Sequence, residues 1–458
     1  MANDLVDLLI IGAGPAGLAA ACEARAAGLS VALFDEQPAS GGQIYRAVDA
    51  ASPKRRELLG EDYAAGAELT REFSRSGAEH VAGAAVWDVS DDLEVSFLRQ
   101  GESHVRRGRH ILLATGAMER PFPVPGWTLP GVMGAGAGQI LFKSAGALPT
   151  EPVVLAGCGP LLFLLASQYL NAGVQIRALV HTTERADYLR AASHLQGAVL
   201  GWRDLRKGLR MLGHIRRKGV PVYSGARDFS IEGNGRAESI RFTHKGREHS
   251  IKSSLILLHQ GVVPNTQLSW ALNAKHNWNE ERLCWEPETD DDGRIADTAI
   301  YIAGDSRAIV GAKASASQGR LAAIAIAERL DALRGHALDD RREQLSAELR
   351  KQVHIRPFLD ALYRPPAGHR KPADDSVIVC RCEEVTAGQV RKYVEVGCQG
   401  PNQAKAFGRC GMGPCQGRLC GLTVTELMAQ GRGVSPMEVG YYRIRAPIKP
   451  VTVGELAK

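Results

Sequence analysis

Apolar residues along this chain gather in short runs, several of which lead directly into glycine turns. Residues 7–11 and 29–34 are two such runs, separated by a glycine turn and an alanine-rich stretch of helical length. The same order of apolar run, glycine turn and helix returns at 153–170, and the runs at 111–114 and 298–303 end in a small-residue turn and in an acid. Short apolar runs alternating with helices are typical of buried parallel strands. The pattern therefore predicts an α/β fold with two Rossmann-like dinucleotide-binding domains.

The longest apolar stretch, 153–170, is close to the length of a membrane span. Gly157, Gly159 and Pro160 follow its strand-like start, so a buried strand, turn and helix explains it better than a span. The N-terminus shows no basic segment and no small-residue cleavage site before its apolar run. The nine cysteines form no obvious disulfide framework. We expect a cytoplasmic protein without a membrane span.

Composition narrows the functional class. With 458 residues, 45% of them hydrophobic and 23% charged, the chain is expected to form two or three domains with large cores. A formal net charge of +6 is small for this length and argues against nucleic acid as a partner. The basic stretch 203–218 is interpreted as a solvated helix face, with a docking surface for a partner as the alternative.

Residues 7–36 carry the pattern of a dinucleotide site. Gly12 permits a tight turn, Gly14 lets the backbone approach a pyrophosphate, and Gly17 brings the helix against the strand. The phosphates would meet the helix N-terminus. An acid about twenty residues on can accept hydrogen bonds from a ribose. The candidate contacts of this first site are Gly12, Gly14, Pro15, Ala16, Gly17, Asp35 and Glu36.

A second turn, with Gly157, Gly159 and Pro160, departs from that pattern. Leu162 stands where the third glycine is expected, and the next strand ends at His181 with no acid. Both changes weaken the case for tight NAD(P)H binding, because the third glycine sets the helix packing and the acid holds the ribose. The sequence leaves open whether this second site holds an adenine nucleotide or nothing.

Five of the nine cysteines lie between positions 380 and 420, as Cys380-Arg-Cys382, Cys398, and Cys410-Gly-Met-Gly-Pro-Cys415-Gln-Gly-Arg-Leu-Cys420. Close pairs of thiolates set among glycines can supply four sulfur ligands to an iron-sulfur cluster or to zinc. The one-residue gap of the first pair is uncommon in zinc sites and favours the cluster. Cys398 is interpreted as structural. No redox Cys-x-x-Cys pair is present nearer the first nucleotide site, where Cys22, Cys158 and Cys284 are interpreted as small hydrophobic residues.

Two segments resemble the further FAD contacts of the two-dinucleotide-domain flavoproteins, the glutathione and thioredoxin reductase superfamily. They are the turn at Thr115 and Gly116 and the strand end at Gly304 and Asp305. The resemblance implies FAD in the first site, with Asp305 near the ribityl chain. The cysteine region resembles the bacterioferritin-associated ferredoxin type of [2Fe-2S] domain. That resemblance assigns Cys380, Cys382, Cys415 and Cys420 as ligands; the sequence does not settle whether Cys410 replaces one of the later pair.

Four further segments resemble the larger, alpha-type subunits of the opine oxidase, hydrogen cyanide synthase and proline or hydroxyproline dehydrogenase family. These are 40–46, which includes Gly42 and Gln43 as cofactor contacts, and 116–131, 261–265 and 442–450. The resemblance implies electron transfer within a heteromeric FAD-dependent amino-acid or opine dehydrogenase. A beta subunit, itself an amino-acid-oxidase-like flavoprotein, would oxidise the C–N bond, and electrons would pass to a downstream acceptor. In some members an FMN lies at the subunit interface. The alternatives are a self-sufficient NAD(P)H-dependent FAD/[2Fe-2S] reductase and a non-catalytic scaffold subunit; no catalytic residue of the chain itself is assigned.

These observations predict a domain order. We expect an FAD-binding domain at 1–120 and 285–335, interrupted by a linker at 121–149 and a second Rossmann-like domain at 150–284. A helical connector at 336–372, a [2Fe-2S] domain at 373–435 and a tail at 436–458 complete the chain.

Overall fold

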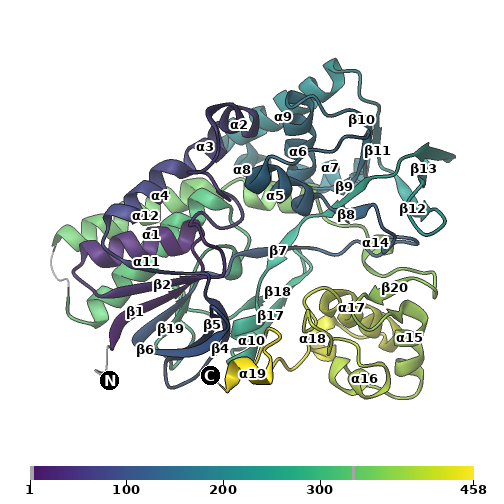
Figure 1. Ribbon diagram of the computed structural model, residues 1–458. Helices are drawn as coiled ribbons and strands as arrows, with labels where there is room; N and C mark the ends of the chain where they lie inside the picture. Colours follow the sequence, from purple (N-terminus) through teal and green to yellow (C-terminus); the bar gives the residue numbers. More distant parts are fainter. Residues whose placement is uncertain (1–4, 333–335, 458) are drawn as a thin grey trace.

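The structure, a computed structural model, describes residues 5–332 and 336–457. Two α/β domains lie one above the other, and a smaller, mainly helical domain lies beside the lower one (Figure 1). Within the described residues, no helix has both the length and the apolar character needed to cross a membrane.

The first domain is built on a parallel sheet whose central strands are buried on both faces. Leu8, Leu9 and Ile10 are fully buried, as expected for a continuous apolar strand. The parallel order is β3-β2-β1-β6-β19, and the first half of the long strand β6 also pairs with an antiparallel ribbon of β4 and β5. The strands are β1 Val6–Ile11, β2 Val31–Asp35, β3 Glu79–Ala82, β4 Ala85–Val89, β5 Glu94–Arg99, β6 Glu102–Leu113 and β19 Ile300–Ile302. The helices are α1 Pro15–Ala26, α2 Pro53–Leu59, α3 Glu61–Ala64, α4 Gly66–Arg75 and α11 Ala312–Arg329.

Helix α1 packs closely on helix α11 because both present small residues. A Cβ added at Gly319 of α11 would lie 2.0 Å from the backbone oxygen of Ala16, so only glycine permits this approach. Residues almost 300 positions apart in sequence thereby form one layer over the sheet, as Figure 1 shows.

The second domain repeats the same plan. Its parallel sheet has the order β11-β10-β9-β15-β8 and is joined by an antiparallel meander, β12-β13-β14. The strands are β8 Val132–Gly134, β9 Val153–Cys158, β10 Ile176–His181, β11 Val222–Ser224, β12 Arg227–Glu232, β13 Ser239–His244, β14 Arg247–Lys252 and β15 Ile256–Gln260. The helices are α5 Ala135–Ala145, α6 Pro160–Asn171, α7 Arg185–Ala192, α8 Leu195–Leu200 and α9 Trp202–Arg217. The apolar stretch 153–170 thus forms strand β9, a turn and helix α6, as predicted.

The boundaries of the second domain differ from those expected. The stretch 121–149, expected to be a linker, supplies the edge strand β8 and helix α5 to the second sheet. At the other end, β16 (Val262–Pro264) pairs with β7 (Ala117–Glu119), and these two strands carry the chain between the domains. The second domain therefore ends near residue 264 rather than 284. A three-residue strand has too little pattern to be recognised, which is why β8 passed for a loop.

The chain then returns to the first domain through α10 (Gln267–Ala271) and the hairpin of β17 (His276–Asn279) and β18 (Cys284–Pro287). After α11, three helices form the connector: α12 His336–Val353, α13 Arg356–Leu362 and α14 Ala367–Arg370. Helix α12 packs on α11, whereas α13 packs on α7 and α8 of the second domain.

The cysteine-rich domain is a small helical unit opened by a short hairpin. Its elements are β20 Ile378–Cys380, β21 Val385–Thr386, α15 Ala387–Glu395, α16 Pro401–Gly408, α17 Gly421–Arg432 and α18 Pro436–Val439. The tail beyond it runs back to the first domain and ends in α19 (Val453–Leu456), where the backbone N–H of Ile448 bonds the carbonyl of Trp87 at 2.9 Å (Figure 1).

Candidate functional site

The first glycine turn forms a cradle at the N-terminus of α1. Gly12 has a φ of +109°, and a Cβ there would lie 2.4 Å from the carbonyl oxygen of Ala114. A Cβ at Gly17 would lie 2.0 Å from the oxygen of Gly12, and one at Gly42 would lie 2.7 Å from the Cα of Gly14. A Cβ on Gly14 itself would meet nothing nearer than 4.0 Å. The backbone is thus packed tightly everywhere except where a pyrophosphate would approach, which fits a dinucleotide.

The two candidate ribose acids have different surroundings. Asp35 is engaged locally: its Oδ2 accepts the N–H of Ala13 at 2.7 Å and its Oδ1 that of Gln37 at 2.8 Å, so it braces the turn. Glu36 instead forms an ion pair with Lys449 of the tail. Partial burial opposes the shift, but Lys449, Arg46 and Arg418 hold the pKa of Glu36 below its usual value. Glu36 is therefore the acid that faces outward from the turn, in a basic setting suited to a nucleotide.

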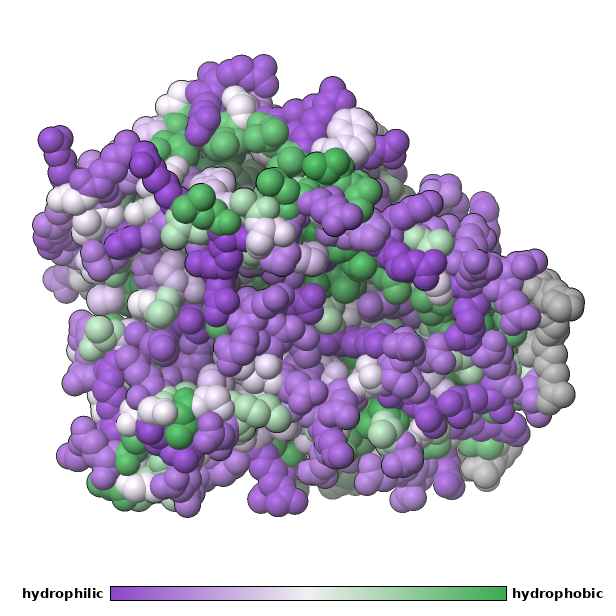
Figure 2. Space-filling view, turned by 180° about the vertical axis from the view of Figure 1, so that it is seen from behind, coloured by the Kyte–Doolittle hydropathy of each residue, from purple (hydrophilic) through white to green (hydrophobic). Residues whose placement is uncertain are grey.

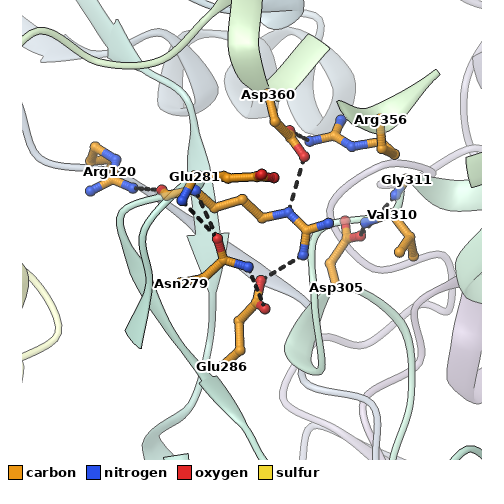
Figure 3. A network of polar contacts seen from close by, with 10 residues as sticks. Arg120, Asn279, Glu281, Glu286, Asp305, Val310, Gly311, Arg356 and Asp360 are labelled. Atoms are coloured by element: carbon orange, nitrogen blue, oxygen red, sulfur yellow. Dashed lines mark hydrogen bonds and ion pairs between the residues drawn. The ribbon is translucent and has the colours of Figure 1, made fainter. Parts of the chain in front are cut away.

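The remaining predicted FAD contacts lie around the same cradle. Asp305, in the short helical turn Gly304–Ser306, accepts the N–H groups of Val310 and Gly311 at 2.8 and 2.9 Å (Figure 3). It thereby shapes the entry to helix α11. A Cβ at Gly304 would lie 2.9 Å from the Cβ of Ala16, so the second FAD segment touches the first helix directly.

Lys143 of α5 was not predicted from the sequence. It is only 2% exposed, and its Nζ donates to the backbone oxygen of Gln43 at 3.1 Å. Burial and the nearby Arg46 lower its pKa to about 7. No local pattern marks this residue, because the contact joins elements 100 positions apart.

A polar network ties the connector to the hairpin beside Asp305 (Figure 3). Arg282 donates to Asp360 of α13 at 3.0 Å and to Glu286 at 2.7 Å, and its backbone oxygen accepts from Arg120 at 2.7 Å. Burial opposes protonation of Arg282, but Glu286 and Asp360 raise its pKa. Strand β7, the hairpin and the connector are held together at this point.

The second glycine turn is occupied by the protein itself. A Cβ at Gly157 would lie 1.6 Å from the oxygen of His259, and one at Gly159 would lie 3.2 Å from the His259 ring. His259 is 2% exposed and contacts Glu119 at 2.5 Å. Gly157, Gly159 and Pro160 do form a strand-turn-helix, but a histidine side chain fills the space beside it.

The connector covers the same turn from outside. The Sγ of Cys158 lies 3.4 Å from the backbone oxygen of Tyr363, and the Tyr363 ring packs 6.2 Å from that of Phe163 in the first turn of α6. Burial raises the pKa of Tyr363 above its usual range. A phosphate would have to displace this segment to reach the N-terminus of α6.

Four of the five clustered cysteines predicted as ligands or left over beside them gather with Cys380, and Cys398 lies apart. The Sγ atoms of Cys380, Cys410 and Cys420 lie within 4.8 Å of one another, and all three residues are buried. Cys382 contacts Cys415 through both the sulfur and the backbone N–H of Cys415. The structure therefore brings Cys410, which the sequence left over, beside two of the predicted ligands.

The surroundings of these sulfurs suit thiolates. Contacts with the Cys410 and Cys420 thiols, and backbone N–H groups of Gly411 and Glu383, lower the pKa of Cys380 to about 2 despite its burial. The Tyr442 hydroxyl donates to the Cys410 sulfur at 3.3 Å. A Cβ at Gly411 would lie 2.5 Å from the Tyr442 ring, so the loop must be glycine-rich to close. Soft ligands with N–H and O–H donors around them fit an iron-sulfur cluster or zinc.

A hydrogen-bonded bridge joins the two candidate sites. The Thr115 hydroxyl donates to the oxygen of Asn265 at 3.0 Å, and the N–H of Asn265 donates to Gly116 at 3.0 Å. Two residues further on, the Gln267 side chain donates to the backbone oxygen of Gln416 at 3.2 Å. Gln416 follows Cys415 directly, so a single short segment connects the FAD-type turn with the cysteine loop.

Comparisons with known proteins agree with this geometry. Residues 6–328 match the family described as pyridine nucleotide-disulphide oxidoreductase, and residues 375–458 match the sarcosine oxidase A3 domain. The chain is 45% identical to an opine oxidase subunit of Rhizobium meliloti, over 100% of its own length and 88% of the relative. The chain belongs to this family of oxidoreductases. The resemblance drawn from the sequence is thereby confirmed.

More distant members span the same length. Hydrogen cyanide synthase subunit HcnB of Pseudomonas aeruginosa is 31% identical, with 97% of this chain and 96% of the relative aligned. Among solved structures, L-proline dehydrogenase from P. horikoshii superposes with a TM-score of 0.72 at 20% identity, covering 99% of this chain and 80% of that one. The α/β fold with two dinucleotide-type domains is confirmed.

Proposed function

We propose that this chain is the electron-transfer subunit of a heteromeric dehydrogenase or oxidase that acts on the C–N bond of an amino acid or opine. The first site would hold FAD and the cysteine loop a [2Fe-2S] cluster. The observation that carries the proposal is the bridge from Thr115 and Gly116 through Asn265 and Gln267 to Gln416, because it places the two candidate redox sites next to each other. The names of the relatives, which are subunits of opine oxidase and hydrogen cyanide synthase, support the substrate class.

For the cluster we propose Cys382 and Cys415 on one iron and Cys380 and Cys420 on the other. The contacts within each pair support this division. Cys410 would then be a neighbouring thiol held by Tyr442 rather than a ligand. The cluster would accept and release single electrons, and the N–H donors of the loop would stabilise its negative charge.

For the flavin we propose contacts with the glycine cradle, with Glu36 at the adenosine ribose, and with Gly42, Gln43, Thr115, Gly116 and Asp305 along the rest of the cofactor. The buried Lys143 would hold the Gln43 backbone in place and keep water out of this side of the site. FAD supplies the step between two-electron and one-electron chemistry.

Substrate oxidation is assigned to a partner flavoprotein, with an FMN between the two chains as in some family members. The covering of the second glycine turn by His259 and Tyr363 argues against direct reduction by NAD(P)H, and so against the self-sufficient reductase. It also favours an empty second site over one that holds an adenine nucleotide. A scaffold role is opposed by the adjacency of the two redox sites, which a purely structural role does not need.

The test compares single serine substitutions at Cys380, Cys382, Cys410, Cys415 and Cys420, with Cys398→Ser as a matched control in the same domain. Iron, acid-labile sulfide, zinc and FAD are measured per chain in anaerobically prepared protein. We expect loss of iron and sulfide at four positions, near-normal content in Cys410→Ser and Cys398→Ser, and bound FAD throughout.

A full complement of zinc would overturn the electron-carrier role of this domain. Loss of iron in Cys410→Ser with retention in Cys420→Ser would instead change only the ligand assignment. Reduction of both cofactors within one turnover, when amine substrate and the partner flavoprotein are added, would exclude the scaffold role.

A further inference from the structure

Helices α7, α8 and α9 expose an unusual number of large apolar side chains. We call the outer face formed by residues 188–209 the α7–α9 surface. Its side chains are between 36% and 77% exposed, and they belong to Tyr188, Leu189, Leu195, Val199, Leu200, Trp202, Leu205 and Leu209. Seen from behind, apolar colour gathers over the upper part of the molecule, which the second domain occupies (Figure 2). Isolated exposed apolar residues are ordinary, whereas a contiguous group marks an interaction site.

The same segment carries most of the positive charge of the chain. Residues 185–218 contain nine Arg or Lys and two Asp, a net +7 against +6 for the whole protein. The rest of the chain is therefore close to neutral. Arg203, Arg206 and Arg210 form no ion pair among the described residues, and the first two lie over the Trp202 ring at 6.0 and 5.9 Å. The cations remain available to a partner.

Helix α9 separates these two properties along its length. Ile215 is fully buried and anchors the helix to the domain. Trp202, Leu205 and Leu209, at spacings of three and four, line one outer edge, and the arginines lie further round toward solvent. An apolar edge with Trp and Leu beside a basic face is the pattern of a helix that lies in the interface of a membrane.

We infer that the α7–α9 surface docks this protein on an anionic lipid surface. A second copy of the chain is disfavoured, because two surfaces of net +7 would repel each other. A rigid protein partner requires a complementary flat or grooved face, whereas these side chains protrude from three short helices. Fluid acyl chains accept protruding Leu, Val and Trp side chains, and anionic headgroups attract the arginines. This inference does not depend on the identity of the substrate or of the cluster.

The test uses the full chain with its cofactors bound. Sedimentation is measured with sucrose-loaded vesicles of phosphatidylcholine alone and of equal parts phosphatidylcholine and phosphatidylglycerol. One variant removes the apolar edge (Leu189→Ser, Val199→Ser, Leu209→Ser), and another removes charge (Arg203→Gln, Arg206→Gln, Arg210→Gln). The matched control replaces apolar residues exposed to a similar degree elsewhere (Val105→Ser, Phe407→Ser, Met437→Ser). Flavin content and far-UV circular dichroism confirm that each variant is folded.

We expect binding to anionic vesicles, little binding to neutral ones, and an affinity at least about tenfold weaker in both surface variants. The control variant should bind as the wild type does. Absence of sedimentation with anionic vesicles would overturn the inference, as would binding that the apolar variant leaves unchanged. A wild-type mass in light scattering that doubles at high concentration, and is halved by the Ser substitutions, would overturn it in favour of a protein interface.

Discussion

Arg370 and Glu426 form a buried ion pair between the connector and the cysteine-rich domain, and its removal should loosen that domain. The side chains are 11% and 3% exposed. Glu426 has one oxygen on Arg370, and its Oε1 has no other hydrogen-bond partner among the described residues. Arg370→Met would therefore leave a carboxylate buried without compensation. Breaking such a pair typically costs 3–5 kcal/mol, so we expect about 4 kcal/mol.

The double variant Arg370→Met/Glu426→Leu provides the internal control. Because it removes both charges and fills the space with apolar atoms, its free energy of unfolding should return to within about 1 kcal/mol of the wild type. Glu426→Leu alone should cost less than Arg370→Met, since Arg370 still donates to the carbonyl of Pro365 at 3.1 Å.

Urea unfolding followed by cluster absorbance and by limited proteolysis between residues 364 and 376 would measure these differences. We expect the cysteine-rich domain of Arg370→Met to unfold before the flavin is released. A cost below about 1 kcal/mol in Arg370→Met would show that water reaches the pair and would refute the reasoning. A double variant as unstable as the single one would refute it equally.

Other contacts lead to three further predictions. Gly14→Val should abolish FAD retention, because a branched side chain would fill the one open position of the cradle; full flavin content in the folded variant would contradict this. Mixing the isolated chain with NADH should leave its flavin oxidised, as stopped-flow absorbance would show, and rapid stoichiometric bleaching would favour the reductase instead. For Lys143, the folded pKa of about 7 lies below the usual 10.5, so the folded state binds fewer protons between these values and stability rises with pH there. The wild type should therefore gain about 1.4 kcal/mol per pH unit relative to Lys143→Met across that window, and parallel urea curves at pH 7 and pH 9 would disprove it.

The sequence allowed the nucleotide fold to be predicted because its signals are local. The turn at Gly12–Gly17 lies between two apolar runs, so strand, turn and helix could be assigned from one window of residues. The cysteine region was harder, since the order of five cysteines along the chain does not determine which sulfurs meet. The structure brings Cys410 next to Cys380 and Cys420, which spacing alone could not show.

The features that escaped prediction depend on contacts between distant segments. Lys143 reaches Gln43, and Tyr363 covers the turn at Cys158, but neither residue stands in a recognisable motif. The strand β8 was missed for a different reason: three residues carry no period, and only pairing with β15 defines them. Long-range packing therefore decided the parts of the site that local pattern could not.

The tail has a consequence for how the protein matures. Lys449 pairs with Glu36 across 413 positions, and Ile448 bonds Trp87, so the last segment to be synthesised completes the surroundings of the first nucleotide site. A nascent chain that folds from its N-terminus would present an open cradle until the ribosome has released it. Cofactor loading is then a late, post-translational event, and a purification tag fused after residue 458 would act on flavin occupancy rather than on the distant end of the molecule.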